Sequence, residues 1–305
     1  MARLATNTIA ENLSVPLITT KITLSLSWQN GKALGQSTIS SAPWPPLLFD
    51  KNLEEIPPFF ALLHPLSPKA HTIAAKAAIA AALGAQALPN EDDRFSFLRE
   101  TAKEQGFYFL FSLPQVLEIT PPDCLLLDFK EMVQAKDTTS FSKTLHTVLG
   151  VMLGSGSMES WQSDRLFSSK GFLSTLIENL NGKLSPPLQK PLLYWLKKRM
   201  ASFCRLQDAL WYPHFYHLRS FPQNGNGKSC IHSARGLIMH QATIEEGQLK
   251  DYALNTPTLR HFSQSGTWAT VVARQDFDSA TTAKTFAALW AAVLDPCVAW
   301  SMRIA

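Results

Sequence analysis

The sequence predicts an α+β protein that is mainly helical, with β-hairpins near both ends. Three observations support this class. "KITLSLSWQNGKALGQSTIS" near the N-terminus alternates apolar and polar residues around Asn30-Gly31, which is typical of a hairpin. Most of the middle of the chain repeats apolar residues at helical spacing. Toward the end, "GLIMHQATIEEGQLKDYAL" has the pattern of a strand, a turn and a second strand.

Composition favours a folded protein without a polyanionic partner. The chain has 305 residues, of which 46% are hydrophobic and 17% charged, with a net charge of +4, so extensive disorder is not expected. We expect one domain over residues 1–305. The densest basic stretch is "LKKRM", which is typical of a solvated helix face, so no nucleic-acid partner is expected.

The hydrophobic and cysteine patterns indicate where in the cell this protein is expected. The alanine-rich "HTIAAKAAIAAALGAQAL" carries Lys76 and predicts a buried helix, not a membrane span. The first residues show no apolar leader. Four scattered cysteines form no CxxC pair. We therefore expect a cytoplasmic, reduced protein that does not span a membrane.

The first half predicts a hairpin and two well-marked helices. The hairpin covers about Lys21–Ser40, with a type I′ turn at Asn30-Gly31. Ser67 can cap a helix that has Pro68 at its first position and ends near Gly84. Asn90 and the three acids after it predict the start of another helix, which ends near Gln105.

The second half predicts more helices, an exposed loop and a second hairpin. Helices are expected within 129–153, at 171–181 and, as the longest one, from 185 to 211, where Cys204 lies on the apolar side. "SFPQNGNGKS" predicts an exposed loop over 220–229. Strands follow within 237–254. A last helix stops at Asp295-Pro296, and Pro296 favours an extended backbone at Asp295.

Three short segments carry the candidate chemistry. "LHPLSPKAH" places His64, Ser67 and His71 at a helix N-terminus, which suits anions. "HSARGLIMH" places Arg235 at the mouth of a strand, where it can clamp an anion. The chain ends in "DPCVAWSMRIA", which holds Cys297 in a stiff corner.

Each segment also has an ordinary explanation. A capping serine, two unremarkable histidines, a structural ion pair and a packed thiol account for the residues one by one. The pair His214 and His217 in "YPHFYH" is better explained by packing than by metal binding. GxGxxG, GxxxxGK[ST], HExxH and GxSxG are absent from any supporting context.

In this order along the chain, the three segments resemble the large subunit of nickel–iron hydrogenases. That family has R-I-C-G-V-C-x-x-A-H early, E-A-P-R-G-x-x-x-H late and D-P-C-x-x-C-x-x-H/R at the end. The resemblance implies a large-subunit-like helical core. The family's N-terminal R-I-E-G-H signature falls on "LITTK", so Thr19 matches its glutamate.

The departures from the family imply that the chain is not a hydrogenase. The four metal-binding cysteines of the family are matched by His64, Ser67, Cys297 and Trp300. One thiolate out of four cannot hold a bridged nickel–iron pair, so no complete nickel–iron site is expected. We therefore predict that the chain is not an enzyme.

The chain more closely resembles the HupK/HoxV group of hydrogenase maturation proteins. That resemblance implies a scaffold or chaperone that transiently holds the Fe(CO)(CN)2 unit before its transfer to the large subunit. Its partners would be other maturation proteins or the large subunit itself. Cys297 and His64 would be metal donors. The residues around the cargo would be Arg235, Ser67, His71 and Asp295.

Two further hypotheses remain open from the sequence. The main alternative is a metal-free mimic of the large subunit that acts only as an interaction scaffold. A degenerate redox enzyme with a mononuclear site is less favoured, because no second thiolate or carboxylate ligand is evident. The carrier hypothesis requires Cys297, His64 and Arg235 to converge. It also predicts an ordered tail, beside the 237–254 hairpin.

Overall fold

The computed structural model describes residues 20–40, 44–154, 171–211, 218–223 and 225–304. Thr19, His214 and His217 lie outside these ranges. The strands are β1 (Lys21–Gln29), β2 (Lys32–Ser40), β3 (Leu218–Gln223), β4 (Asn226–Ser233), β5 (Gly236–Glu245), β6 (Gln248–Asn255) and β7 (Ala299–Ile304).

Helices make up most of the rest of the described chain, as the sequence predicts. The α-helices are α1 (Ile56–Leu63), α2 (Pro68–Ala82), α3 (Glu91–Phe107), α4 (Leu113–Leu117), α5 (Asp123–Gln134), α6 (Thr138–Leu153), α7 (Phe172–Lys183), α8 (Pro186–Cys204), α9 (Leu206–Trp211), α10 (Pro257–Phe262), α11 (Thr267–Ala273) and α12 (Ala280–Leu294). A 3₁₀ segment, η1 (Pro45–Leu48), precedes α1, and a π-helical segment, η2 (Tyr108–Ser112), joins α3 to α4. The mainly helical α+β class is confirmed.

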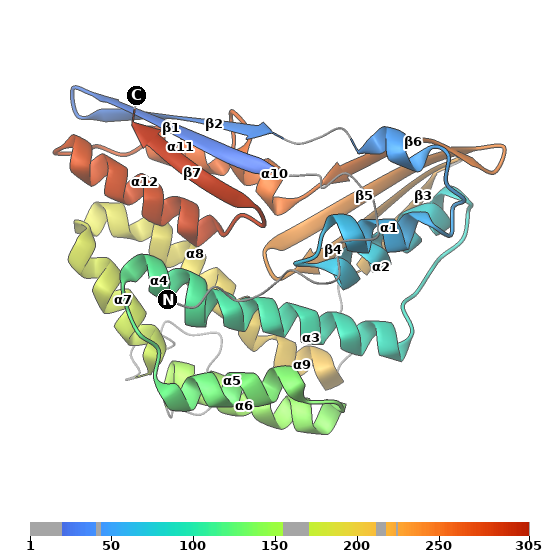
Figure 1. Ribbon diagram of the computed structural model, residues 1–305, viewed down its shortest axis with the longest axis horizontal. Helices are drawn as coiled ribbons and strands as arrows, with labels where there is room; N and C mark the ends of the chain where they lie inside the picture. Colours follow the sequence, from blue (N-terminus) through green and yellow to red (C-terminus); the bar gives the residue numbers. More distant parts are fainter. Residues whose placement is uncertain (1–19, 41–43, 155–170, 212–217, 224, 305) are drawn as a thin grey trace, which may run out of the picture.

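Two separate sheets lie on one side of the helices (Figure 1). The first has the order β2-β1-β7 and packs on α11 and α12. Its hairpin turn has positive φ at both Asn30 and Gly31, which confirms the predicted type I′ geometry. Ile22, Leu24 and Leu26 of β1 face the core and are buried.

The C-terminal strand joins this first sheet. β7 runs parallel to β1, with Ile22 opposite Trp300 and Leu24 opposite Met302. The described tail is therefore ordered, as predicted, but its predicted place beside the 237–254 hairpin was wrong. β1 offers an unpaired edge with a buried apolar face, and β7 completes that edge.

The second sheet is larger than the predicted hairpin and packs on α2. Its order is β3-β4-β5-β6, all antiparallel. The predicted loop over 220–229 was wrong, because this stretch supplies most of β3 and the first half of β4. Its glycines are loop signals in sequence, but Gly225 supplies a turn with positive φ, and Gly227 sits on β4 against α2.

Gly227 sets how closely the second sheet approaches α2, and this gives a first prediction. A Cβ at this position would collide with the α2 backbone at Ala78 and Ala82. Gly227→Ala should therefore lower the free energy of unfolding by about 1–3 kcal/mol. Urea unfolding measures this. Gly182→Ala in α7, where a Cβ meets nothing, should instead raise it by about 0.5–1 kcal/mol. Equal effects of the two changes would contradict this packing.

The predicted helix boundaries are mostly confirmed. The Asn90 side chain caps α3 by accepting from the Asp93 backbone N–H at 2.7 Å. α12 ends at Leu294, as expected. The long helix expected over 185–211 is two helices, because the chain turns at Arg205 between α8 and α9. Cys204 is buried in the core, as predicted.

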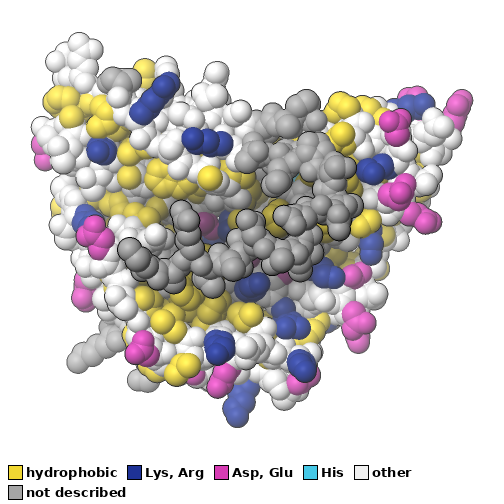
Figure 2. All heavy atoms as spheres, viewed as in Figure 1, with side chains coloured by type: hydrophobic (Ala, Val, Ile, Leu, Met, Phe, Trp, Pro, Cys, Tyr) yellow, Lys and Arg dark blue, Asp and Glu magenta, His cyan; other side chains and the backbone are white. Residues whose placement is uncertain are grey.

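The surface shows no segregation of charge on the face seen in Figure 2, where basic and acidic side chains are intermixed. Among the described helices, none has the length and apolar character needed to cross a bilayer. Under this surface, α3 and α8 pack against each other, with α9, α5 and α6 also against α3. These two central helices carry the polar residues that surround the candidate site.

Candidate metal-cargo site

Four of the six predicted site residues line one cavity. Cys297, His64, Ser67 and His71 surround a cavity of about 360 Å³, together with Thr258. It lies where the α1–α2 loop meets the segment between α12 and β7. The other two, Arg235 and Asp295, line a neighbouring cavity of about 480 Å³. Pro65 and Leu66 belong to the walls of both. The predicted convergence of Cys297, His64 and Arg235 is therefore wrong for Arg235, which borders the cavity of the other two without lining it.

The Cys297 thiol is held in place by Thr258. The Thr258 hydroxyl lies 3.1 Å from Sγ, to which it donates, and it accepts from the Cys297 backbone N–H at 3.1 Å. Burial raises the pKa of the thiol, although Thr258 and the Arg235 charge act in the opposite direction. The group is therefore a thiol at neutral pH and must lose a proton to bind a metal.

The histidines of this cavity continue into a buried chain. The His64 ring stacks on His71 with centroids 3.8 Å apart. His71 Nδ1 lies 3.0 Å from His240 Nε2, and His240 Nδ1 lies 2.6 Å from the Tyr252 hydroxyl. His240 is thus part of this row of contacting histidines. His232, in contrast, lies on the exposed side of β4 and lines a different cavity.

Burial keeps these imidazoles neutral. It lowers the pKa of His64 to about 4 and takes the pKa values of His71 and His240 well below the usual range. A neutral imidazole keeps a free lone pair on one nitrogen, which is the form that binds metals. The imidazole of His64 makes no hydrogen bond to a described residue and lines the cavity, so its ring nitrogens remain available as donors.

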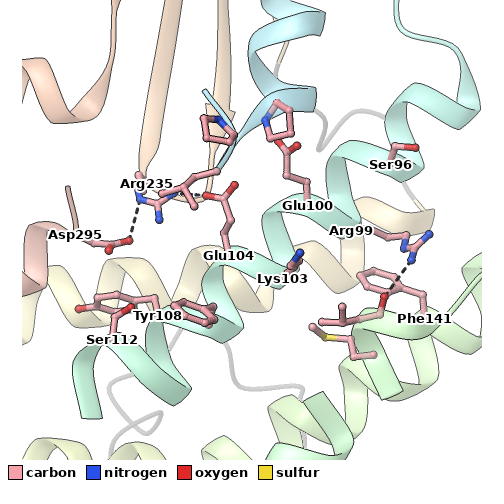
Figure 3. Close-up of a pocket in the computed structure, with 16 residues that line it drawn as sticks. Ser96, Arg99, Glu100, Lys103, Glu104, Tyr108, Ser112, Phe141, Arg235 and Asp295 are labelled. Carbon is pink, nitrogen blue, oxygen red and sulfur yellow. Dashed lines mark hydrogen bonds and ion pairs between the residues drawn. The ribbon is translucent and has the colours of Figure 1, made fainter. Parts of the chain in front are cut away.

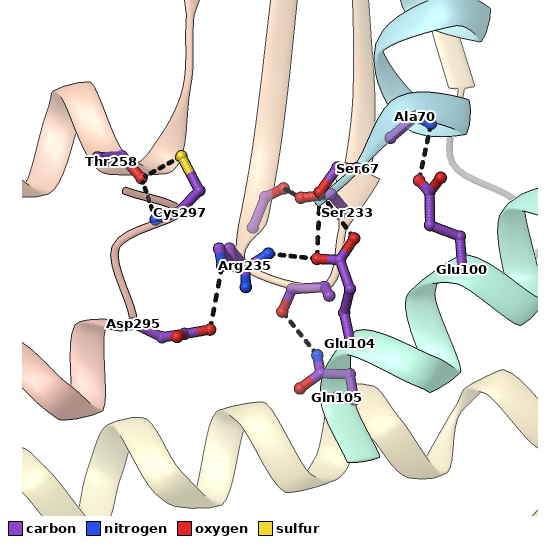
Figure 4. A network of polar contacts seen from close by, with 12 residues as sticks. Ser67, Ala70, Glu100, Glu104, Gln105, Ser233, Arg235, Thr258, Asp295 and Cys297 are labelled. Carbon is purple, nitrogen blue, oxygen red and sulfur yellow. Dashed lines mark hydrogen bonds and ion pairs between the residues drawn. The ribbon is translucent and has the colours of Figure 1, made fainter. Parts of the chain in front are cut away.

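Arg235 is held by two carboxylates, one of which the sequence did not reveal. Its guanidinium forms an ion pair with Glu104, and its Nε lies 3.1 Å from Asp295 Oδ2 (Figures 3 and 4). The Ser67 hydroxyl donates to Glu104 at 2.9 Å. Burial lowers the pKa of Arg235, because it disfavours the charged guanidinium. The negative charges of Asp295 and Glu104 have the larger, opposite effect, so the pKa of Arg235 is raised.

Ser67 therefore has a different role from the predicted one. It stands at the N-cap position of α2 but makes no capping hydrogen bond, because its hydroxyl is committed to Glu104. The free N–H groups of this helix end are taken by Glu100, which accepts from Lys69 at 2.6 Å and from Ala70 at 3.0 Å. The expected open anion site at this helix end is thus filled by the protein's own carboxylate.

Asp295 anchors the tail to the helices. Arg199 of α8 donates to its carboxylate at 2.7 Å, and the Arg199 guanidinium lies 3.5 Å above the Tyr108 ring. The backbone of Asp295 is left-handed, with φ 48°, so the predicted extended backbone was wrong. The residue ends α12 in a conformation that costs about 1 kcal/mol in a non-glycine residue, and its two arginine partners offset that cost.

A complete nickel–iron site does not fit these residues. The positions that match the family's four cysteines hold His64, Ser67, Cys297 and Trp300, and Trp300 lines neither cavity. Within the described ranges, no group of three or more His, Cys, Asp or Glu side chains is arranged to hold a metal. Among its described lining residues the cavity offers one thiol and one imidazole without a hydrogen bond as donors, which are too few for a bridged metal pair.

Comparison with known proteins identifies the fold of the chain. No protein-family model matches the chain, and no curated protein matches its sequence. Solved structures do match. A [NiFeSe] hydrogenase from Desulfovibrio vulgaris Hildenborough, the G491S variant pressurized with oxygen gas, superposes with a TM-score of 0.59 at 10% identity over 92% of this chain and 99% of that one.

Two further structures agree. The reduced [NiFeSe] hydrogenase of the same organism gives a TM-score of 0.55 at 11% identity, with 88% and 94% of the two chains covered. An NAD⁺-reducing [NiFe]-hydrogenase gives 0.52 at 10% identity, with 88% and 93% covered. The chain has the fold of nickel–iron hydrogenase large subunits. At this identity the likeness shows the fold alone.

Proposed function

We propose that this protein is an accessory factor of the HupK/HoxV type in the maturation of a nickel–iron hydrogenase, and not itself an enzyme. It would act in the cytoplasm, on other maturation proteins or the large subunit. Its cargo would be the Fe(CO)(CN)2 unit, held transiently. The observation that carries this proposal is the single cavity in which Cys297 and His64 lie together, with Arg235 beside it.

The donor set suits a carrier that must release its cargo. Cys297 supplies a thiolate only after losing a proton, since burial raises its pKa, so reprotonation favours release. His64 is already neutral and can donate a lone pair. Arg235 supplies a cation near Cys297. The N–H groups of its guanidinium can hydrogen-bond an anionic ligand such as cyanide.

The first test is the iron content of the protein. Full-length protein would be purified without oxygen from cells that contain the hydrogenase maturation machinery. We expect iron in the wild type and at least a tenfold loss in Cys297→Ser, because the only thiol among the described lining residues is gone. Cys204→Ser, a change of a core thiol away from the cavity, should keep the iron. Equal iron in all three proteins would contradict a role for Cys297.

The metal-free interaction scaffold remains the second candidate. It is favoured because, in the described part of the chain, no group of three or more His, Cys, Asp or Glu side chains is arranged to hold a metal, although His71 lies beside His64. It predicts that Cys297→Ser leaves hydrogenase maturation in cells unchanged, whereas the carrier predicts its loss. Hydrogenase activity of a strain complemented with each variant distinguishes the two.

A further inference from the structure

A third cavity borders Arg235 and differs from the other two in its charge. It has a volume of about 250 Å³ and lies between α8, the β4–β5 turn, α10 and α12. Its walls contain four cationic side chains: Lys198, Arg199, Arg205 and Arg235. No aspartate or glutamate is among its described lining residues.

These four cations exceed the carboxylates that pair with them. Within the described residues, the ion pairs of this group involve Glu104 and Asp295. Neither carboxylate lines this cavity. Among the described residues, two carboxylates against four cations leave an excess of two positive charges, because Lys198 and Arg205 form no ion pair with a described acidic side chain. Their repulsion would be relieved by an anion with about two negative charges.

The cavity also has hydrogen-bond donors to offer. Lys198 and Ser202 lie four residues apart on one face of α8, and Arg205 follows at the C-cap of that helix. Lys198 lies 4.6 Å over the Tyr194 ring, and Arg205 donates one N–H to the Ala201 carbonyl. These contacts leave most donors of the ammonium and the guanidinium unused.

His261 completes the wall as a neutral group. Burial is the main reason that its pKa is lowered to about 4, and the nearby Arg260 charge adds to it. Its Nδ1 lies 3.0 Å from the Thr267 hydroxyl. A neutral imidazole carries one N–H and no net charge, so His261 adds a polar group to the wall without adding another charge.

We propose that this cavity binds a small phosphate-bearing anion, such as a phosphate monoester. A phosphate group carries nearly two negative charges at neutral pH, which matches the excess, and arginine binds its oxygens with two parallel hydrogen bonds. A volume of about 250 Å³ holds a phosphate with a small substituent, and it is below the usual range for drug-sized ligands. The proposal does not depend on the carrier function.

Calorimetric titration of the full-length protein tests the site. The probes are inorganic phosphate and glycerol phosphate at pH 7.5, with ionic strength held constant by sodium chloride. We expect saturable binding to the wild type. The double change Lys198→Gln and Arg205→Gln should weaken it at least tenfold. Both side chains are exposed, so the fold should survive, and thermal unfolding checks this.

Two further variants separate a site from general charge attraction. Lys190→Gln with Arg274→Gln removes the same charge from exposed positions outside the cavity and should leave binding unchanged. Ser202→Asp places a carboxylate in the wall and should abolish binding. Tighter binding of glycerol phosphate would identify a monoester ligand, whereas equal binding would identify phosphate itself. No saturable binding by the wild type, or equal loss in both double variants, would overturn the proposal.

Discussion

Replacing Arg235 by Met is expected to lower the free energy of unfolding by about 3–5 kcal/mol, because it leaves the buried Glu104 carboxylate without a cation and takes one of two cations from Asp295. Glu104 and Asp295 both pair with this guanidinium, and the side chains of all three are about one-tenth exposed. Glu104 would keep only the Ser67 hydroxyl, and Asp295 only Arg199. Urea unfolding at pH 7.5 measures the loss.

Two comparisons give this prediction its control. Arg219→Met on the exposed face of β3 removes the same charge from the surface and should change the free energy of unfolding by less than about 0.5 kcal/mol. Adding Glu104→Gln to Arg235→Met should recover part of the lost free energy of unfolding, since it removes the buried carboxylate that no cation then pairs. A loss below about 1 kcal/mol in Arg235→Met would contradict the ion-pair network.

The second large effect is loss of stability in acid, which the buried histidines cause. His64, His71 and His240 have pKa values lowered mainly by burial, to about 4 for His64. In the unfolded chain each takes up a proton near pH 6.5. The unfolded state therefore binds more protons between about pH 6.5 and 4, and stability is lost as the pH falls through that range.

Each fully contributing histidine adds a slope of about 1.4 kcal/mol per pH unit. Glu100 and Glu104 act in the opposite direction. Burial raises the pKa of both, to about 7 for Glu100, so they favour the folded state in acid and lose that contribution as the pH rises. His261, whose pKa burial also lowers to about 4, acts in the same direction as the other three histidines. The slope of the whole protein is the sum of all these effects, and a histidine variant isolates one of them.

His64→Phe is the variant that isolates one histidine. Phenylalanine can keep the stacking on His71 and Phe60, while it removes one titrating group. Urea unfolding between pH 4.5 and 6.5 should show a slope shallower by about 1.4 kcal/mol per pH unit. Leu127→Phe, at an exposed position on α5, removes no titrating group and should leave the slope as it is. Parallel slopes for wild type and His64→Phe would show that His64 is protonated in the folded protein.

The sequence predicts the local elements of this fold well, and its long-range contacts less well. Asn30-Gly31, Asn90 and Asp295-Pro296 mark a turn, a helix start and a helix end through local chemistry, and the structure has all three. The partner of β7 is different. β1 lies almost the whole chain away, and both strands have edges that several partners could satisfy.

In the candidate site, too, the sequence predicts the residues of local motifs but not the partners that are distant along the chain. The order of three motifs indicates His64, Ser67, His71 and Cys297, which line one cavity. Glu104 and Arg199 were missed, because each is one more polar residue on a helix until its partner is known. Arg235 is 131 residues from Glu104, and Asp295 is 96 residues from Arg199. Polar residues on the packed side of α3 were the available signal, and they do not identify a partner.

The measurement that tests the central claim most directly is an infrared spectrum of the anaerobically purified protein, taken from cells with the full maturation machinery. The carrier function predicts stretching bands of metal-bound CO and cyanide in the wild type and in Cys204→Ser, and their loss in Cys297→Ser. Bands that persist in Cys297→Ser, or a wild-type spectrum without them, would contradict the claim that Cys297 holds an iron unit in this cavity.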